Sequence, residues 1–295
     1  MDQQLEWIAQ IQGRWSLTAN RLKSVYERVR WITFGFSILG ALGAAIASQR
    51  EDSTRLALAV VSAVLFGVAT FLTARFLGAA HAIAWVRARA ASEALKRAAY
   101  SYATVAAPYD DPLRRDEQLR SDVQKIETDV DDLLGQQASP VRGSTPSTQL
   151  DPSAYRAVRV LGAVDWYERS ASEYQVVARR LRRIEFSLAL VTTALTAIVG
   201  ALSKVWLRET TGFDWVVLTA VLTTISGAIL THVEASRYDI LIVIYRAAAR
   251  RLREELVASA ASLASPSADW SAFVERCEAI IAQENGSWVA RFGKP

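Results

Sequence analysis

Five hydroxyl side chains in the second half of the chain recur at helical spacing within long apolar stretches. Thr219, Thr223 and Ser226 stand at i, i+4 and i+7, which is one face of a helix. Thr192 and Thr196 form an i, i+4 pair in the preceding apolar stretch. Such a stripe can line a water-filled path through an oligomer, so we take these five residues as pore-lining candidates. The same hydroxyls can instead bond their own helix backbone or a neighbouring helix, and both interpretations stay open.

Two carboxylates stand at the ends of the same apolar stretches. Glu185 precedes one stretch and Glu234 follows the other. If a pore exists, these side chains can ring its cytosolic mouth and favour cations. The alternative is pairing with Arg182, Arg183 or Arg237, because charges at a membrane edge reach the headgroup region easily.

The sequence contains no pattern typical of an enzyme or of a cofactor site. It has no G-x-x-x-x-G-K-[ST] phosphate loop, no G-x-S-x-G nucleophile motif and no H-E-x-x-H zinc motif. Cys277 is the only cysteine, and the two histidines, His81 and His232, lie far apart. We therefore expect no catalytic residue, no cofactor and no metal site.

Four apolar stretches must position the hydroxyls and carboxylates: 31–48, 56–76, 186–203 and 215–233. At about 1.5 Å per helical residue, a run of this length covers roughly the 30 Å hydrocarbon core of a bilayer. The sequence therefore predicts an all-α membrane protein with two tandem two-span hairpins. Small residues at four-residue spacing predict close packing of the first two spans. They are Gly40, Gly43, Ala44, Ala47, Ala63 and Gly67.

Basic residues cluster next to the ends of both hairpins that lie away from the connecting loops. The blocks 14–30, 75–97, 169–183 and 237–253 each carry five Lys or Arg, whereas each loop inside a hairpin carries two, offset by two acidic residues. The positive-inside rule then predicts a multi-pass protein of the inner (cell) membrane with both termini in the cytoplasm. The net charge of +4 and the pI of about 9.3 follow from topology, so we expect no nucleic-acid partner. Contact with anionic lipid, pairing with acidic helices and a nucleotide phosphate site are the three alternatives for the arginine clusters.

The segment between the hairpins is rich in Gly, Ser and Pro. It predicts a flexible linker at 135–153 that joins a first half, 1–134, to a second half, 154–295. Each half ends in cytosolic helices that form a bundle. Because no Pro or Gly interrupts residues 79–107, we expect the second span of each hairpin to continue into the cytosol as one long helix.

The order of these segments resembles the SLATT superfamily, the SMODS- and SLOG-associating two-transmembrane effector domains of bacterial conflict systems. The stretch "FVERCEAIIAQENGSW" carries the resemblance, with Glu275, Glu278, Glu284 and Trp288. The first half has a looser match that lacks the tryptophan, with Val123, Ile126, Glu127 and Leu133 in the corresponding helix. The resemblance thus covers two tandem copies. It implies a pore-forming membrane effector of bacterial defence that is gated by a partner or a nucleotide signal.

These observations lead to one functional expectation and one rival. Four spans are too few to surround an aqueous pore, so a pore requires a homo-oligomer in the bilayer, gated by a cytosolic protein or nucleotide signal. We expect an oligomeric ion channel or pore. The rival is a non-conducting membrane scaffold whose cytosolic bundle recruits partners. Transport by alternating access is a weaker third, since the sequence indicates neither broken helices nor deep charges.

Overall fold

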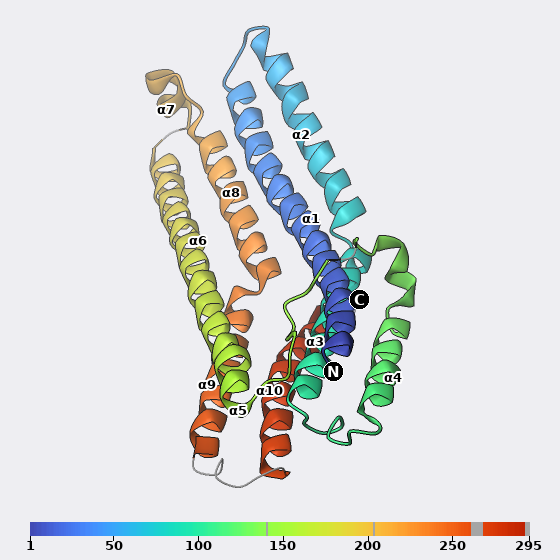
Figure 1. The fold of residues 1–295 in the computed structure, drawn as a ribbon. Helices are drawn as coiled ribbons and strands as arrows, with labels where there is room; N and C mark the ends of the chain where they lie inside the picture. Colours follow the sequence, from blue (N-terminus) through green and yellow to red (C-terminus); the bar gives the residue numbers. More distant parts are fainter. Residues whose placement is uncertain (140, 203, 261–267, 293–295) are drawn as a thin grey trace. The chain divides into compact units, whose positions relative to one another are not determined.

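The computed structural model describes residues 1–139, 141–202, 204–260 and 268–292. Within these residues the chain is helical and contains no strand, which confirms the all-α prediction (Figure 1). The helices are α1 Asp2–Ser48, α2 Thr54–Phe76, α3 Ala79–Ala103, α4 Arg115–Thr128, the 3-10 helix η1 Asp131–Gln136, α5 Pro152–Tyr155, the π-helical η2 Arg156–Leu161, α6 Gly162–Ala201, α7 Lys204–Thr211, α8 Trp215–Ser236, α9 Tyr238–Ala260 and α10 Ala268–Phe292. Among the described residues, four helices are long and apolar enough to cross a membrane. They contain the four predicted spans except for Leu202, which follows the end of α6, and Ser203, which lies outside the described residues.

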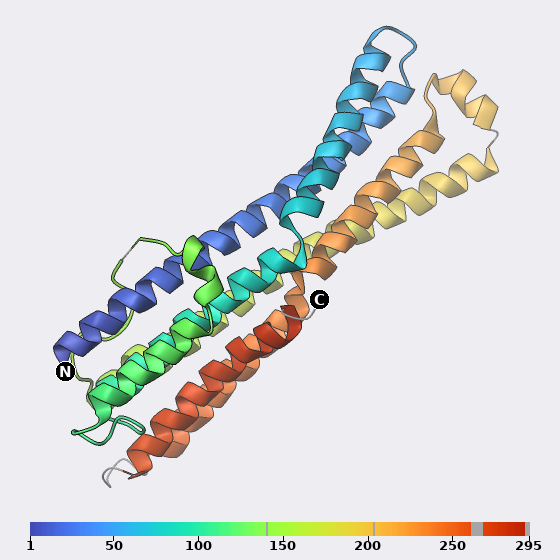
Figure 2. The same ribbon diagram turned by 90° about the vertical axis from the view of Figure 1, so that its right-hand side faces the viewer.

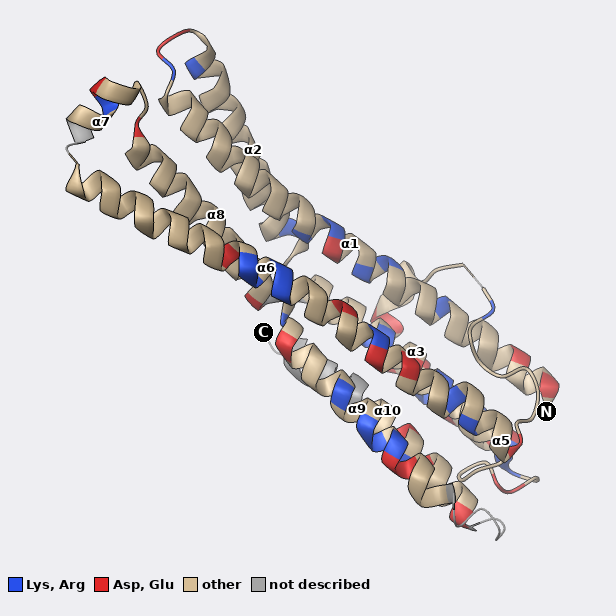
Figure 3. Ribbon diagram, turned by 90° about the vertical axis from the view of Figure 1, so that its left-hand side faces the viewer, with Lys and Arg blue, Asp and Glu red and all other residues tan. Residues whose placement is uncertain are grey.

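The chain divides into two compact units, and each unit takes elements from both halves of the sequence. The membrane unit comprises Glu27–Gly78 and Glu173–Leu241. The helical bundle comprises Met1–Tyr26, Ala79–Ser172 and Ile242–Pro295. Figure 3 shows the difference in composition, because the stretches of α6 and α8 next to α7 are almost free of charge while α9 and α10 carry both signs. The division into tandem halves at 135–153 rests on the sequence repeat and stays a prediction.

Both hairpins of the membrane unit turn at the same end. The Gln49 side chain donates to the Asp214 carbonyl at 3.2 Å and accepts from the Asp214 amide at 2.9 Å. Arg208 and Glu51 stand 3.9 Å apart beside this contact. The two loops are therefore neighbours, as a parallel pair of hairpins requires, and Figure 2 shows the two turns side by side.

Small residues bring α1 and α2 together, as the sequence predicts. A Cβ atom at Gly40 would lie 3.1 Å from the Phe66 ring, and one at Gly43 would lie 2.5 Å from the Ser62 hydroxyl. Gly67 has open space around its Cα, so it takes no part in this packing. The expectation of close approach is confirmed for Gly40 and Gly43 and not for Gly67.

The long continuous helices that we expected after the second spans are interrupted. Leu77 and Gly78 separate α2 from α3, and Arg237 separates α8 from α9 with a φ of 49°. A left-handed residue ends the ladder of helical hydrogen bonds, which resumes only at Leu241, whose amide donates to the Arg237 carbonyl at 3.2 Å. Each second span thus ends near the membrane unit's charged edge, and a separate helix begins there.

Helices from both halves interlock in the helical bundle. The last helix, α10, packs along α3 of the first half, and α4 packs on α3 as well. Tyr155 lies at the centre, with its ring centroid 5.6 Å from Trp270 and 6.2 Å from Tyr100. The Trp270 indole donates to the Thr104 carbonyl at 3.1 Å, which fixes the start of α10 against the end of α3.

A buried ion pair lies beside this aromatic core. Arg159 donates to both carboxylate oxygens of Glu278, at 2.8 and 2.7 Å, and the two side chains are 6% and 1% exposed. The Tyr155 hydroxyl donates to the same carboxylate at 3.1 Å. Burial lowers the pKa of Arg159, but the Glu278 carboxylate more than offsets this, so the net shift of that pKa is upward.

The segment between the halves follows α1 closely. The Gly143 amide donates to the Ala9 carbonyl at 2.8 Å, and the Ala138 amide donates to the Thr18 hydroxyl at 2.9 Å. Arg142 forms an ion pair with Glu6 at 3.0 Å. These bonds hold the path of the segment in the structure, while its flexibility stays a prediction.

We expect Cys277 to resist alkylation in the native protein. The side chain is 0% exposed, and burial raises the pKa of its thiol to about 12. Because only the thiolate reacts, iodoacetamide should label it at least roughly a hundredfold more slowly at pH 8 than in urea with SDS. Mass spectrometry measures this directly, since Cys277 is the only cysteine. Fast native labelling would show that α10 does not stay packed on the bundle.

Candidate site at the charged edge of the membrane unit

The predicted pore-lining threonines bond their own helices. Thr192 donates to the Leu188 carbonyl at 2.7 Å, and Thr196 donates to Thr192 at 2.8 Å. On α8, Thr219 donates to Val216 at 2.7 Å and Thr223 donates to Thr219 at 2.8 Å. This is the backbone bonding that the sequence left open. Each hydroxyl oxygen still keeps acceptor capacity, so the role of these residues in lining a pore stays a prediction.

Ser226 behaves differently from the four threonines. Its hydroxyl donates to a carboxylate oxygen of Glu185 at 3.5 Å, across from α8 to α6. A residue predicted as pore-lining and a residue predicted at the pore mouth are therefore in contact. The contact lies within the membrane unit and joins the two spans of the second hairpin.

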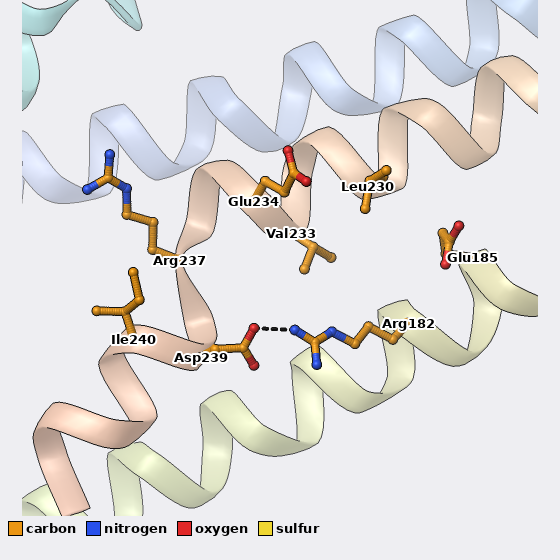
Figure 4. Close-up of a pocket in the computed structure, with 8 residues that line it drawn as sticks. All are labelled: Arg182, Glu185, Leu230, Val233, Glu234, Arg237, Asp239 and Ile240. Atoms are coloured by element: carbon orange, nitrogen blue, oxygen red, sulfur yellow. Dashed lines mark hydrogen bonds and ion pairs between the residues drawn. The ribbon is translucent and has the colours of Figure 1, made fainter. Parts of the chain in front are cut away.

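The two predicted mouth residues, Glu185 and Glu234, line one open-sided pocket of about 440 Å³, which we call the edge pocket (Figure 4). Helix α6 contributes Glu185, and α8 contributes Glu234 near the break at Arg237. The remaining lining residues are Arg182, Leu230, Val233, Arg237, Asp239 and Ile240. The structure thus places both predicted carboxylates at one site.

An ion pair that the sequence did not predict lies in the lining of the edge pocket. Arg182 pairs with Asp239 at the start of α9, as the dashed line in Figure 4 marks. Both side chains are more than half exposed, so this pair contributes little to stability. The edge pocket therefore brings together three carboxylates, Glu185, Glu234 and Asp239, and two arginines, Arg182 and Arg237, so its lining carries a small excess of negative charge.

His232 connects the second hairpin to the first. Its ring centroid lies 4.4 Å from Trp31 and 4.9 Å from Phe34, and the residue is 4% exposed. Its Nε2 atom is buried without a hydrogen-bond partner among the described residues. The sequence showed only that this histidine lies far from His81, and no local pattern indicated that its ring packs against two rings of α1.

The described residues contain no group of three or more His, Cys, Asp or Glu side chains arranged to hold a metal ion.

Family comparison places these side chains in a known kind of domain. Residues 155–288 match the model of the SMODS and SLOG-associating 2TM effector domain 1. The second half of the chain is therefore similar to SLATT-type domains. Helices α6 and α8, and with them the edge pocket, lie inside the matched region, a similarity that supports a membrane-associated effector.

The first half of the chain has a different match. Residues 13–117 match a family described as protein of unknown function (DUF4231). That a second SLATT copy occupies the first half therefore stays a prediction. No curated protein and no solved structure matches the chain.

Proposed function

We propose that several copies of this protein associate in the membrane to form a cation-conducting pore. The observation that carries this proposal is the edge pocket, where Glu185, Glu234 and Asp239 outnumber the two arginines of the lining at the end of apolar spans, in a region similar to SLATT-type domains. Four spans enclose too little space for an aqueous path, so the pore requires a homo-oligomer. The hydroxyl stripe of α8 would continue the path from the carboxylates into the bilayer.

The proposal includes an orientation and a trigger. The basic flanks put the edge pocket and the helical bundle in the cytoplasm of an inner-membrane protein. A cytosolic protein or a nucleotide signal that binds the helical bundle would then open the pore. No chemical step is part of this function, so the protein would act without catalysis.

Neutralising both carboxylates is the test of the proposed pore. In liposomes carrying the purified protein, we expect Glu185→Gln with Glu234→Gln to lower the cation-over-anion permeability by roughly tenfold, because a negative mouth concentrates cations. Thr219→Leu with Thr223→Leu should lower conductance for both ions. The matched control is Thr224→Leu. The Thr224 hydroxyl also donates to a carbonyl of its own helix, that of Ala220, but it lies on another face of α8.

The non-conducting scaffold makes the opposite prediction. Its oligomers would leave the vesicles sealed even with the activating partner present, and the substitutions would leave partner binding unchanged. Oligomeric mass in the same detergent separates failed assembly from failed conduction. Sealed vesicles around a verified, partner-bound oligomer would reject the pore.

A further inference from the structure

A second pocket lies entirely within the helical bundle, and its walls are basic. We call it the basic pocket, and its volume is about 460 Å³, within the range of small-molecule sites. Helix α3 contributes Arg89, Lys96 and Tyr100 from one face, since they are spaced at i, i+7 and i+11. The facing wall is the π-helical η2 and the start of α6, with Arg159 and Trp166.

Lys96 is a charge without a partner in this pocket. It is only partly exposed, and within the described parts of the chain no hydrogen bond or ion pair reaches its ammonium group. Burial lowers the pKa of Lys96, and the nearby Glu93 carboxylate acts in the opposite direction without restoring it. An ammonium group that loses hydration without a hydrogen-bonded counter-ion is stabilised when an anion binds beside it.

The other two cations can reach the same space. Glu278 takes the Nε and Nη2 groups of Arg159 and leaves Nη1 without a hydrogen bond among the described residues. Arg89 lies over the Trp166 ring at 5.7 Å. Glu93 is the one acidic residue among those that line the pocket in the described structure, and Glu278 pairs with Arg159 behind the wall, so three positive charges face two negative ones and the site is basic overall.

We propose that the basic pocket binds a phosphate monoester with an aromatic or other apolar body. The phosphate group would take Lys96 and the free edge of Arg159, because its anionic oxygens accept hydrogen bonds from both cations. The body would lie on the apolar part of the pocket, at Val158, Trp166 and Ile281. A free phosphate ion would satisfy the cations but leave these apolar surfaces uncovered.

This inference does not depend on ion conduction. Binding is measured on the full chain in detergent, where no flux is involved, so a pore that fails its test leaves the site standing and the reverse also holds. A ligand here would bridge α3 of the first half and η2 of the second. It would therefore stabilise the interlocked form of the helical bundle.

The probes are phenyl phosphate and inorganic phosphate, measured by calorimetry and by the rise in Tm with ligand concentration. We expect phenyl phosphate to bind at least roughly tenfold more tightly than inorganic phosphate, because only the ester covers the apolar wall. Lys96→Met should weaken binding by roughly 10- to 100-fold, the size of a lost charge-assisted bond. Arg114→Met is the matched control, since its side chain is 86% exposed and lies outside the pocket.

A second variant guards against misfolding of the first. Arg89→Met should weaken the binding of phenyl phosphate while Arg114→Met leaves it within about twofold of the wild type. Wild-type protein that binds neither probe would overturn the proposal. Equal affinities for the two probes would contradict the preference for a phosphate ester. If Lys96→Met and Arg89→Met both bind phenyl phosphate like the wild type, the ligand does not bind in the basic pocket.

Discussion

Replacing Arg159 with methionine is expected to destabilise the helical bundle by about 3–5 kcal/mol. The change leaves the Glu278 carboxylate 1% exposed and bonded only by the Tyr155 hydroxyl among the described residues. The low-dielectric surroundings that strengthen the intact pair also raise the energy of a single buried charge. Methionine has nearly the length of the arginine stem, so the substitution leaves no large cavity. The loss of folding stability is therefore mainly electrostatic.

The rate of Cys277 alkylation measures this effect in the folded protein. Opening of the bundle exposes the thiol, so the labelling rate should rise by at least roughly a hundredfold in Arg159→Met. The control is Glu168→Ala, which removes an exposed pair with Arg253 that links α6 to α9 at 2.8 Å. We expect that variant to change stability by at most about 1 kcal/mol. Equal labelling of the two variants would contradict the role of the buried pair.

The double substitution separates the charge from the packing. Arg159→Met with Glu278→Leu removes both charges, so we expect it to recover most of the stability that the single variant loses. The recovered labelling rate would show that the pair itself adds little net free energy. If the double variant is no more stable than the single variant, the ion pair stabilises the folded protein more than two apolar side chains in the same place do.

The sequence predicted the spans well because hydropathy over a bilayer's length is a local property. The stretches 56–76 and 215–233 lie within helices α2 and α8, and the loops of both hairpins meet at one end. The break at Arg237 was not predictable in the same way. No Gly or Pro marks it, and a left-handed arginine reflects contacts that form only in the folded chain.

The candidate sites were predicted in unequal measure. Glu185 and Glu234 could be placed at the same edge because both lie at span ends. Asp239 forms an ion pair with Arg182 and lies just past the break. Because the break itself was not predictable from the sequence, this pairing was not predicted either. Arg159 and Glu278 are 119 residues apart, and no periodic pattern connects residues at that separation. Glu278 appeared in the sequence only as part of the stretch that carried the family resemblance.

Gly13→Val is expected to detach the segment between the halves from α1. A Cβ atom at Gly13 would lie 2.7 Å from the Gly143 amide nitrogen, 2.9 Å from the Arg142 carbonyl carbon and closer still to the Val141 oxygen. These neighbours are backbone atoms, so no change of side-chain rotamer can relieve the contact. Overpacking of this kind costs about 1–3 kcal/mol, and occasionally more.

Trypsin cleavage after Arg142 reports this detachment. If the segment must leave α1 to be cut, the cleavage rate follows the open population and should rise by roughly tenfold or more in Gly13→Val. Gly135→Ala is the matched control, because a Cβ atom there meets nothing within 4 Å. A segment that is flexible in solution, as its Gly, Ser and Pro content predicts, would be cut quickly in the wild type and no faster in Gly13→Val. The two rates therefore decide between a mobile linker and one that the close approach of Gly13 and Gly143 holds against the helix.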